Sequence, residues 1–312
     1  MKTTSLFLLV LFLGFAQLHA DPAPGTPPSS IPPRPELPPP PSTVNLIRDV
    51  VYGQAGGHPL YLHLALPETL PDKPMPAIIL IHGGGWHQGT RAADVGEAYI
   101  FAGHGYVAAS IEYRLAQEAP FPAQLEDCKC AVRFLRAKAA DYHIDAGRIA
   151  VMGDSAGGHL SALMGLTNGM KEFEGDGGWA DQSSSVQAVC DWYGPTDLVA
   201  WVKGNPKLAK DPFLPLFFGG TVADHPEKAA YASPMTYVSG SKDTPPFLIM
   251  HGDQDPLVPV QQSIMLAEAL IAAGDDVTLH VIKGAAHGGP GWGLKKPWPE
   301  VIEFFDHNLK GE

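Results

Sequence analysis

The sequence has few charged residues, and few of those are basic. Charged residues make up 17% of the 312 residues, and 33 Asp and Glu against 21 Lys and Arg give a net charge of −12. Contacts with a phosphate backbone need clustered Lys and Arg, and the sequence contains no such cluster. The composition therefore argues against a nucleic-acid-binding protein, and no nucleic-acid partner is predicted.

Cysteine is also scarce. Cys128, Cys130 and Cys190 are the only three, and their spacing does not fit a zinc site, because paired ligands usually have two to four residues between them. Cys128 and Cys130 point to different faces of a predicted helix, so a bridge between these two is not expected. An exported chain could still pair two of the three, which leaves the pairing open. No metal and no cofactor is predicted.

No apolar run is long enough to span a bilayer. The run from Leu6 to Phe15 has ten residues, follows Lys2 and is followed by Ala20 and Asp21, which is the layout of a secretory signal peptide. Residues 1–20 are therefore predicted to be a signal peptide cleaved near Ala20, and the mature chain to be secreted or periplasmic. An uncleaved signal that tethers the chain to a membrane is the alternative.

Proline and glycine are abundant, with 31 and 34 residues, and eleven of the prolines fall between Pro22 and Pro41. That segment has no apolar periodicity, so 21–41 is predicted to be an extended polyproline spacer. A ligand for an aromatic groove on a partner is the alternative. The remaining residues, 42–312, are predicted to form one catalytic domain.

Within 42–312, short apolar runs alternate with helical patterns, which is typical of a sheet covered by helices. The pattern predicts a doubly wound α/β fold with a mostly parallel eight-stranded sheet and helices on both faces. The stretch 195–246 shows no clear strand and is predicted to form a small cap or a substrate wall. Strands are predicted over 45–52, 60–66, 77–81, 107–111, 149–152, 186–192, 247–250 and 277–282, and helices over 121–139, 157–166, 260–273 and 298–309.

The clearest chemical motif is the sequence Gly-Asp-Ser-Ala-Gly at 153–157, between a predicted strand and a predicted helix. This placement is that of a nucleophile elbow, a sharp turn that exposes a serine and needs small neighbours. The N-terminus of the following helix favours negative charge nearby. Ser155 is therefore the predicted nucleophile.

A second motif, His-Gly-Gly-Gly-Trp at 82–86, follows the predicted strand 77–81. Backbone N–H groups in such a loop, together with the N–H of Ala156, could stabilise the oxyanion of an acyl-transfer intermediate. A tight turn or a phosphate-binding loop would be the alternatives. A phosphate-binding loop is disfavoured because the Lys-Ser or Lys-Thr of a P-loop does not follow the glycines.

A serine nucleophile needs a histidine base and an acid, which in this fold follow in the order Ser, acid, His. Asp253 and Asp255 both follow the strand 247–250, and the pattern of His-Gly, two residues, Asp and an apolar Leu-Val-Pro favours Asp255. A calcium loop is the alternative, but the further oxygen ligands are missing. His287 follows the last predicted strand and is flanked by glycines, so it is the predicted base.

These motifs resemble the α/β-hydrolase superfamily, in the esterase branch related to hormone-sensitive lipase, over about residues 45 to 310. The sequences at 113–115, 125–127, 153–160 and 193–198 are similar to those of bacterial bifunctional feruloyl and acetyl xylan esterases. The resemblance implies a triad of Ser155, Asp255 and His287. It also implies an oxyanion hole made by the N–H groups of Gly84, Gly85 and Ala156.

The resemblance implies a serine carboxylic ester hydrolase that acts on acetyl or feruloyl esters of plant polysaccharides or on small aryl and alkyl esters. The alternatives are an arylformamidase-like amidase, a prolyl-peptidase-like enzyme, for which the chain has no room for a propeller, and a catalytically inactive binding protein. Trp86, Trp192 and Tyr193 follow predicted strand ends, where they could form an aromatic substrate wall or pack in the core. The sequence does not determine the oligomeric state.

Overall fold

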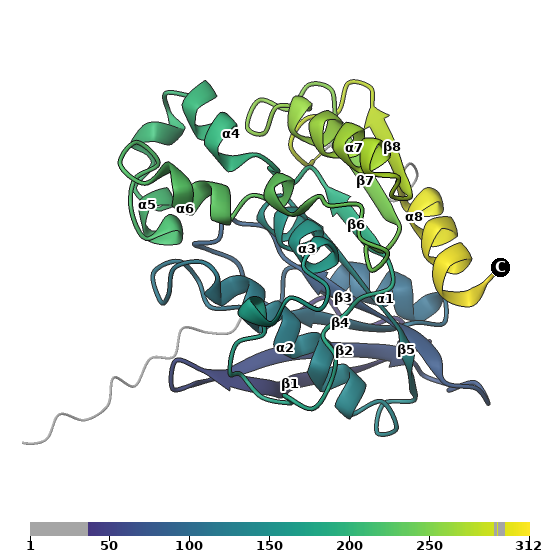
Figure 1. The fold of residues 1–312 in the computed structure, drawn as a ribbon. Coiled ribbons are helices and arrows are strands. Elements are labelled where there is room, and N and C mark those ends of the chain that lie inside the picture. Colours follow the sequence, from purple (N-terminus) through teal and green to yellow (C-terminus); the bar gives the residue numbers. More distant parts are fainter. Residues whose placement is uncertain (1–36, 290–291, 293–296) are drawn as a thin grey trace, which may run out of the picture. The chain divides into compact units, whose positions relative to one another are not determined.

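The computed structural model describes residues 37–289, 292 and 297–312. The predicted signal peptide and residues 21–36 of the predicted spacer lie outside the described residues. Leu37–Glu312 forms one compact unit by its internal contacts, and Figure 1 shows its elements.

One mixed sheet forms the centre of this unit, with the strand order β1-β2-β4-β3-β5-β6-β7-β8. β1 and β2 pair antiparallel, as do β2 and β4, and every other pair is parallel. The prediction of a mostly parallel eight-stranded sheet is confirmed. The strands are β1 (Val44–Ala55), β2 (His58–Pro67), β3 (Met75–Ile81), β4 (Val107–Ile111), β5 (Ile144–Asp154), β6 (Val189–Trp192), β7 (Phe247–Gly252) and β8 (Val277–Ile282).

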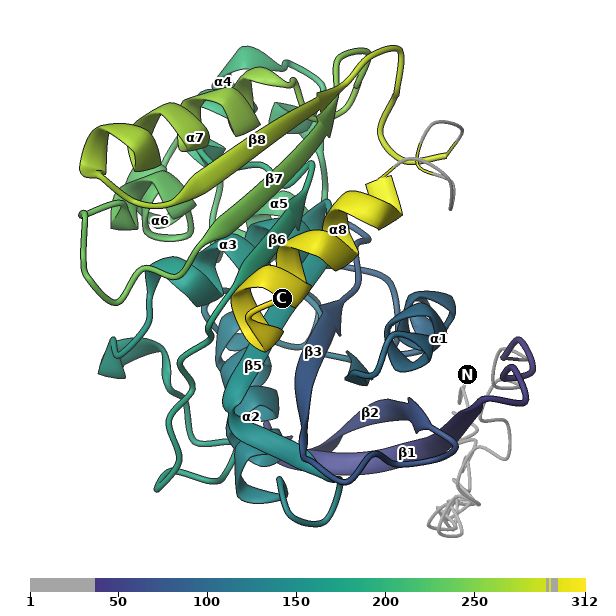
Figure 2. The ribbon, with the colours of Figure 1, turned by 90° about the vertical axis from the view of Figure 1, so that its right-hand side faces the viewer.

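Helices cover both faces of the sheet, as Figure 2 shows. The helices α2 (Ala123–Ala137), α3 (Ala156–Leu166) and α7 (Gln261–Ala273) bury apolar side chains in one core cluster. The helices α1 (Val95–Gly103) and α8 (Pro297–Phe305) contribute to a second cluster on the other face. A π-helical turn, Asp306–Lys310, follows α8.

The helix α1 is absent from the sequence-based prediction. Its sequence, VGEAYIFAG, has little amphipathic contrast and a glycine near each end, so no helical stripe stands out. The fold requires a crossover here because β3 and β4 are parallel neighbours. The predicted C-terminal helix 298–309 is divided between α8 and the π-helical turn.

The stretch 195–246 contains several short helices and no strand. Figure 1 shows them grouped beside α3. One of them, η3 (Pro234–Tyr237), contacts both α3 and α7. The others are α4 (Leu198–Gly204), η2 (Leu208–Lys210), α5 (Leu214–Phe218) and α6 (Pro226–Tyr231), and η1 (Lys171–Phe173) precedes the stretch.

Cys128, Cys130 and Cys190 are all buried free thiols, so no disulfide links any pair of them. Burial raises the pKa of the Cys128 thiol well above its ordinary value. None of the described helices is long and apolar enough to cross a membrane.

The register of the parallel strands brings the candidate site together. Gly153 in β5 pairs with Asp191 in β6, and Asp191 in turn pairs with Ile249 in β7. The carboxyl ends of these strands therefore lie at the same edge of the sheet. The loops that carry Ser155, Asp255 and His287 all begin at that edge, where ligands bind in open α/β sheets.

Candidate active site

Ser155 stands alone between the end of β5 and the start of α3. Its backbone has φ 53° and ψ −115°, a left-handed conformation that is uncommon for a residue with a Cβ. The turn brings its flanking residues against β3: a Cβ on Gly157 would lie 1.8 Å from the Ile81 carbonyl oxygen, and one on Gly153 would lie 2.6 Å from it. Glycine is therefore required at both positions, which explains the Gly-x-Ser-x-Gly spacing.

Two hydrogen bonds join Ser155, His287 and Asp255. The Ser155 hydroxyl lies 2.8 Å from Nε2 of His287, and Nδ1 of His287 lies 2.6 Å from Oδ2 of Asp255. With the Nδ1–H donating to the carboxylate, Nε2 is free to accept the serine proton. The three residues predicted from the sequence thus lie in contact in the order that proton transfer requires.

Asp255 is held by more than His287. Its Oδ1 accepts hydrogen bonds from the backbone N–H groups of Leu257 at 2.8 Å and Val258 at 2.9 Å. Oδ2 lies 3.2 Å from Nε2 of His251, and the Asp255 side chain is fully buried. Burial alone would raise the pKa of Asp255, but the hydrogen bonds from the two histidines and from the Val258 amide hold it well below the ordinary value.

Asp253, the competing acid in the sequence analysis, lies elsewhere. Its Oδ1 accepts a hydrogen bond from the Gly284 N–H at 2.6 Å and so closes the loop beside β8. Asp255, not Asp253, contacts His287.

The glycine loop lies against the elbow. Gly84 and Gly85 have φ of 112° and 58°, and a Cβ on Gly84 would lie 2.2 Å from the Gln88 carbonyl oxygen. The N–H of Gly83 donates to Oδ1 of Asp154 at 2.9 Å, which ties the loop to the residue before the serine. Glycine at positions 84 and 85 therefore allows the positive φ that the turn needs. It also leaves the backbone N–H groups without a Cβ beside them.

Ser155, His287 and the glycine loop line a cavity of about 330 Å³, which is largely apolar beyond the polar residues of the elbow. We call it the serine cavity. Five of its lining residues come from the 195–246 stretch: Pro195, Trp201, Leu208, Asp211 and Leu214. The others include Ser155, His287, Gly84, Gly85, Trp86, Ala156, Leu257 and Val258.

The three predicted wall aromatics are placed differently from one another. Trp86 lines the serine cavity but is 1% exposed, and its ring stacks on Phe217 with centroids 4.3 Å apart. Trp192 and Tyr193 line a separate cavity, and the Tyr193 ring lies 4.7 Å from that of His287. Neither of them is among the residues that line the serine cavity, so the predicted wall role is not supported for these two.

Sequence reasoning missed His159, which is fully buried in α3. Its Nδ1 accepts a hydrogen bond from the Trp86 indole N–H at 3.2 Å, and its Nε2 lies 2.7 Å from the Ala232 carbonyl oxygen. Burial lowers the pKa of His159 to about 4, so this ring is neutral. The sequence did offer one indication of this residue: His159 follows the predicted nucleophile by four residues and lies on the predicted helix 157–166.

Other motif residues of the resemblance act as supports. Arg114 donates to both carboxylate oxygens of Asp127, and the Tyr113 hydroxyl donates to the His82 carbonyl oxygen at 3.0 Å. The Tyr113 ring also stacks on His82 with centroids 4.3 Å apart. The two Tyr113 contacts fix His82 at the start of the glycine loop. Within 37–289 and the other described positions, no group of three or more His, Cys, Asp or Glu could hold a metal ion.

Comparisons with known proteins agree with this arrangement. The BD-FAE family matches residues 62–270 of the chain. Esterase LipC of Mycobacterium tuberculosis is 36% identical over 227 residues, 71% of this chain and 55% of LipC. Esterase LipQ of the same organism is 32% identical over 232 residues, 72% of this chain and 53% of LipQ. The chain thus spans about half the length of these curated relatives.

Solved structures share the fold over most of the chain. A truncated carbohydrate esterase from gut microbiota has a TM-score of 0.77 and 30% identity, over 87% of this chain and 99% of that one. Esterase 2 of Thermogutta terrifontis with propionate bound has a TM-score of 0.68 and 26% identity, over 86% of this chain and 94% of that one. Family match, sequence relatives and fold agree: the chain belongs to the BD-FAE family, in the hormone-sensitive-lipase-like branch of the α/β-hydrolase superfamily.

Proposed function

We propose that this protein is a serine carboxylic ester hydrolase that works through an acyl-enzyme intermediate. The observation that carries the proposal is the continuous chain of hydrogen bonds from Ser155 through His287 to Asp255, beside the glycine loop. The relatives named esterases support it as well.

In this mechanism His287 takes the proton from the Ser155 hydroxyl as the oxygen attacks the ester carbonyl. Asp255 is ionised because its pKa is low, and it stabilises the imidazolium that forms. The N–H groups of Gly84, Gly85 and Ala156, which line the same cavity, stabilise the oxyanion. His287 then protonates the leaving alcohol, and water activated by the same histidine releases the acid.

The proposed substrates are acetyl or feruloyl esters of plant polysaccharides, or other small aryl and alkyl esters. The names of two structural neighbours, a carbohydrate esterase and a bifunctional GH43-CE protein of Bacteroides eggerthii, favour a carbohydrate ester. Propionate and butyrate complexes of the Thermogutta esterase favour a short acyl group. The serine cavity, at about 330 Å³, lies at the small end of ligand pockets.

The test is Ser155→Ala, assayed with para-nitrophenyl acetate, methyl ferulate and acetylated xylan. We expect kcat to fall on the order of 10⁴-fold or more while the fold is retained. A fluorophosphonate probe should label the wild type but not Ser155→Ala. Ser161→Ala is a matched control in the same helix, because the Ser161 hydroxyl is buried without a hydrogen-bond partner among the described residues.

Retention of most activity by Ser155→Ala would contradict the assignment of the nucleophile. Turnover of N-formylkynurenine without turnover of any ester would favour the arylformamidase alternative. Failure of the probe to label the wild type would favour an inactive binding protein.

For location, we propose export of the mature chain after cleavage near Ala20. N-terminal sequencing of the protein from the extracytoplasmic fraction tests this. An intact N-terminus in the membrane fraction would favour the tethered alternative.

A further inference from the structure

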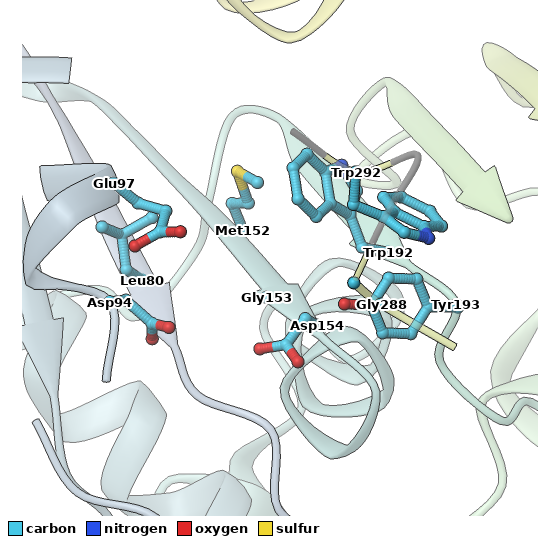
Figure 3. Close-up of a pocket in the computed structure, with 11 residues that line it drawn as sticks. Leu80, Asp94, Glu97, Met152, Gly153, Asp154, Trp192, Tyr193, Gly288 and Trp292 are labelled. Carbon is cyan, nitrogen blue, oxygen red and sulfur yellow. The ribbon is translucent and has the colours of Figure 1, made fainter. Parts of the chain in front are cut away.

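Trp86 connects the glycine loop to the wall of the serine cavity. Of the three predicted wall aromatics it is the one that lines this cavity, whereas Trp192 and Tyr193 lie around a neighbouring cavity (Figure 3). The Trp86 backbone has φ 60°, a left-handed conformation that is uncommon for a bulky residue. Such a conformation persists only where the surrounding structure holds it, so the neighbours of Trp86 have to fix its position.

The Trp86 ring is held by aromatic contacts and by one hydrogen bond. It stacks on Phe217 with centroids 4.3 Å apart and meets the Trp201 ring edge-on at 6.3 Å. Its indole N–H donates to Nδ1 of His159 at 3.2 Å. Trp86 is 1% exposed and His159 is fully buried, so water does not replace this hydrogen bond when it is lost. A variant that lacks the acceptor therefore leaves a buried donor unpaired.

His159 can accept this hydrogen bond in one tautomer only. An indole N–H donates and a backbone carbonyl accepts, so Nδ1 is the unprotonated nitrogen. Nε2 carries the proton and donates it to the Ala232 carbonyl oxygen at 2.7 Å. Burial lowers the pKa of His159, which agrees with a neutral ring. The contact with Ala232, in the 195–246 stretch, thus keeps Nδ1 available as the acceptor for Trp86.

Two ties hold the glycine loop against the elbow, one at each end of the loop. At the start, the Gly83 N–H donates to Oδ1 of Asp154, the residue before the nucleophile, at 2.9 Å. At the end, the Trp86 side chain is bonded to His159 on the helix that follows the nucleophile. The two residues between these ties, 84 and 85, carry the N–H groups that the resemblance assigns to the oxyanion hole.

The third N–H of the oxyanion hole belongs to Ala156, the first residue of α3. His159 follows three residues later, and its backbone N–H donates to the Ser155 carbonyl oxygen at 3.0 Å. An oxyanion is stabilised best when its donors already point to one place before the reaction begins. Donors on two different segments need a link that fixes the loop relative to the helix, and the hydrogen bond between His159 and Trp86 is such a link.

We propose that His159 is a positioning residue of the oxyanion hole. By accepting the Trp86 indole N–H, it fixes the end of the glycine loop against α3. The N–H groups of Gly84 and Gly85 then face the same point as that of Ala156. His159 does not line the serine cavity, so it acts through Trp86 and not on the substrate. This role rests on the proposed ester hydrolase function and adds a residue to that site.

The test compares His159→Asn with His159→Gln, which separate the two contacts of the imidazole. Asn places its carbonyl oxygen near Nδ1 and keeps an acceptor for Trp86, whereas Gln places its amide near Nε2 and keeps a donor for Ala232. We expect His159→Gln to lower kcat on para-nitrophenyl acetate by about 10- to 100-fold, and His159→Asn to recover most of that loss. KM should change by less than about twofold in both variants.

Melting temperature provides the matched control, because each variant loses one buried hydrogen bond and both should melt several degrees lower. A purely structural role would lower kcat in both variants alike, in proportion to the loss of stability. That outcome, or a kcat that His159→Gln leaves intact, overturns the proposal.

A trifluoromethyl ketone reports on the oxyanion hole itself. The Ser155 oxygen bonds to its carbonyl carbon, the serine proton passes to His287, and the carbonyl oxygen becomes an alkoxide in the oxyanion hole. The affinity for this inhibitor should fall in His159→Gln by about the same factor as kcat, while KM stays nearly constant. An unchanged affinity would show that the oxyanion hole does not depend on His159.

Trp86→Phe tests the same hydrogen bond from its other end, because phenylalanine keeps a ring beside Phe217 and lacks the N–H. It should lower kcat by about the same factor as His159→Gln, and the double variant should lose no more than either single variant. Losses that multiply in the double variant, or an unchanged kcat in Trp86→Phe, overturn the proposal.

Failure of the proposed function gives a different result from failure of the positioning role. A wild type that cleaves no ester and is not labelled by the fluorophosphonate contradicts the ester hydrolase, and the positioning role falls with it. A wild type that cleaves esters, with equal losses of kcat in the two His159 variants, contradicts the positioning role alone and leaves the ester hydrolase standing.

Discussion

Asp255 accepts hydrogen bonds from two histidines, and only His287 contacts the nucleophile. The other, His251, is fully buried, with its Nδ1 2.7 Å from the Ser263 hydroxyl and its Nε2 2.9 Å from the Val258 carbonyl oxygen. These contacts orient the Nε2–H so that it also reaches Asp255 at 3.2 Å. His251 is therefore a positioning residue that acts through Asp255.

We predict that His251→Ala lowers kcat on small esters by about 10- to 100-fold, because Asp255 loses a donor that fixes its orientation. KM should change by less than about twofold, since His251 does not line the serine cavity. His251→Gln, whose amide can replace the Nε2 donor, should recover part of the loss. Steady-state kinetics of both variants decide this. An equal loss in both, together with a lower melting temperature, would point to a purely structural role.

We expect Asp191 to make the stability of the protein depend on pH. It is fully buried in β6, its Oδ1 accepts from the Gly194 N–H at 2.9 Å, and burial raises its pKa to about 6. In the unfolded chain an aspartate loses its proton near pH 4, by ordinary values. Between roughly pH 4 and 6 the folded state therefore binds more protons, and the free energy of unfolding falls as the pH rises.

We predict that Asp191→Asn removes this slope, because the amide keeps the Oδ1 acceptor and does not ionise. The wild type should lose on the order of 3 kcal/mol more than the variant between pH 4 and 6.5. Urea unfolding of both proteins at these two pH values measures the difference. Parallel pH profiles would show that Asp191 does not control the slope.

At the scale of elements, the short helices of 195–246 form one wall of the serine cavity. Leu214 in α5 lines the cavity and is 6% exposed, whereas Leu216, two residues later, is 44% exposed and does not line it. The same helix thus provides a cavity residue and a matched surface residue.

We predict that Leu214→Ala enlarges the serine cavity and raises the kcat/KM ratio of para-nitrophenyl octanoate to acetate by about tenfold, since each buried methylene contributes about 0.8 kcal/mol. Leu216→Ala should leave the ratio unchanged. Assays with acyl chains of increasing length provide the measurement. A shift of the ratio by both variants would place the acyl group elsewhere.

At the scale of the whole molecule, the candidate site and its supports lie within the unit Leu37–Glu312. Two hydrogen bonds hold the first residues of this unit. The Tyr99 hydroxyl donates to the Pro38 carbonyl oxygen at 2.8 Å, and the Val44 N–H donates to the Pro41 carbonyl oxygen at 2.9 Å. The last residues of the predicted spacer therefore contact α1 and the first residue of β1.

We predict that a chain beginning at Leu37 keeps kcat/KM on para-nitrophenyl acetate within about twofold and keeps its melting temperature, because the contacts to Pro38 and Pro41 survive. A chain beginning at Ser42 loses both and keeps the Thr43 carbonyl oxygen that accepts from the Glu68 N–H, and it should melt several degrees lower, at about 1 kcal/mol for each lost hydrogen bond. Differential scanning calorimetry compares the two. Equal melting temperatures would show that these contacts contribute nothing to stability.

Much of the fold follows from local patterns. The apolar run at 107–111 matches β4 in both bounds, because a strand buried in a parallel sheet needs continuous apolar sequence. The run at 277–282 matches β8 in both bounds as well, although β8 is an edge strand with only Ile282 buried. The prediction misses α1, whose apolar residues lie all around the helix and give no stripe. It starts the sixth strand at 186, whereas β6 starts at Val189, since apolar sequence alone does not mark where pairing begins.

The sequence by itself determined which residues can carry the chemistry, because a nucleophile elbow and a glycine loop need glycine at fixed positions beside fixed polar groups. Only the tertiary structure decided which side chains share a cavity. Trp86 lines the same cavity as Ser155, whereas Trp192 and Tyr193 line another cavity. His159 gains its partners, Trp86 and Ala232, through contacts between distant segments. Such contacts depend on how strands and helices pack, which local sequence does not encode.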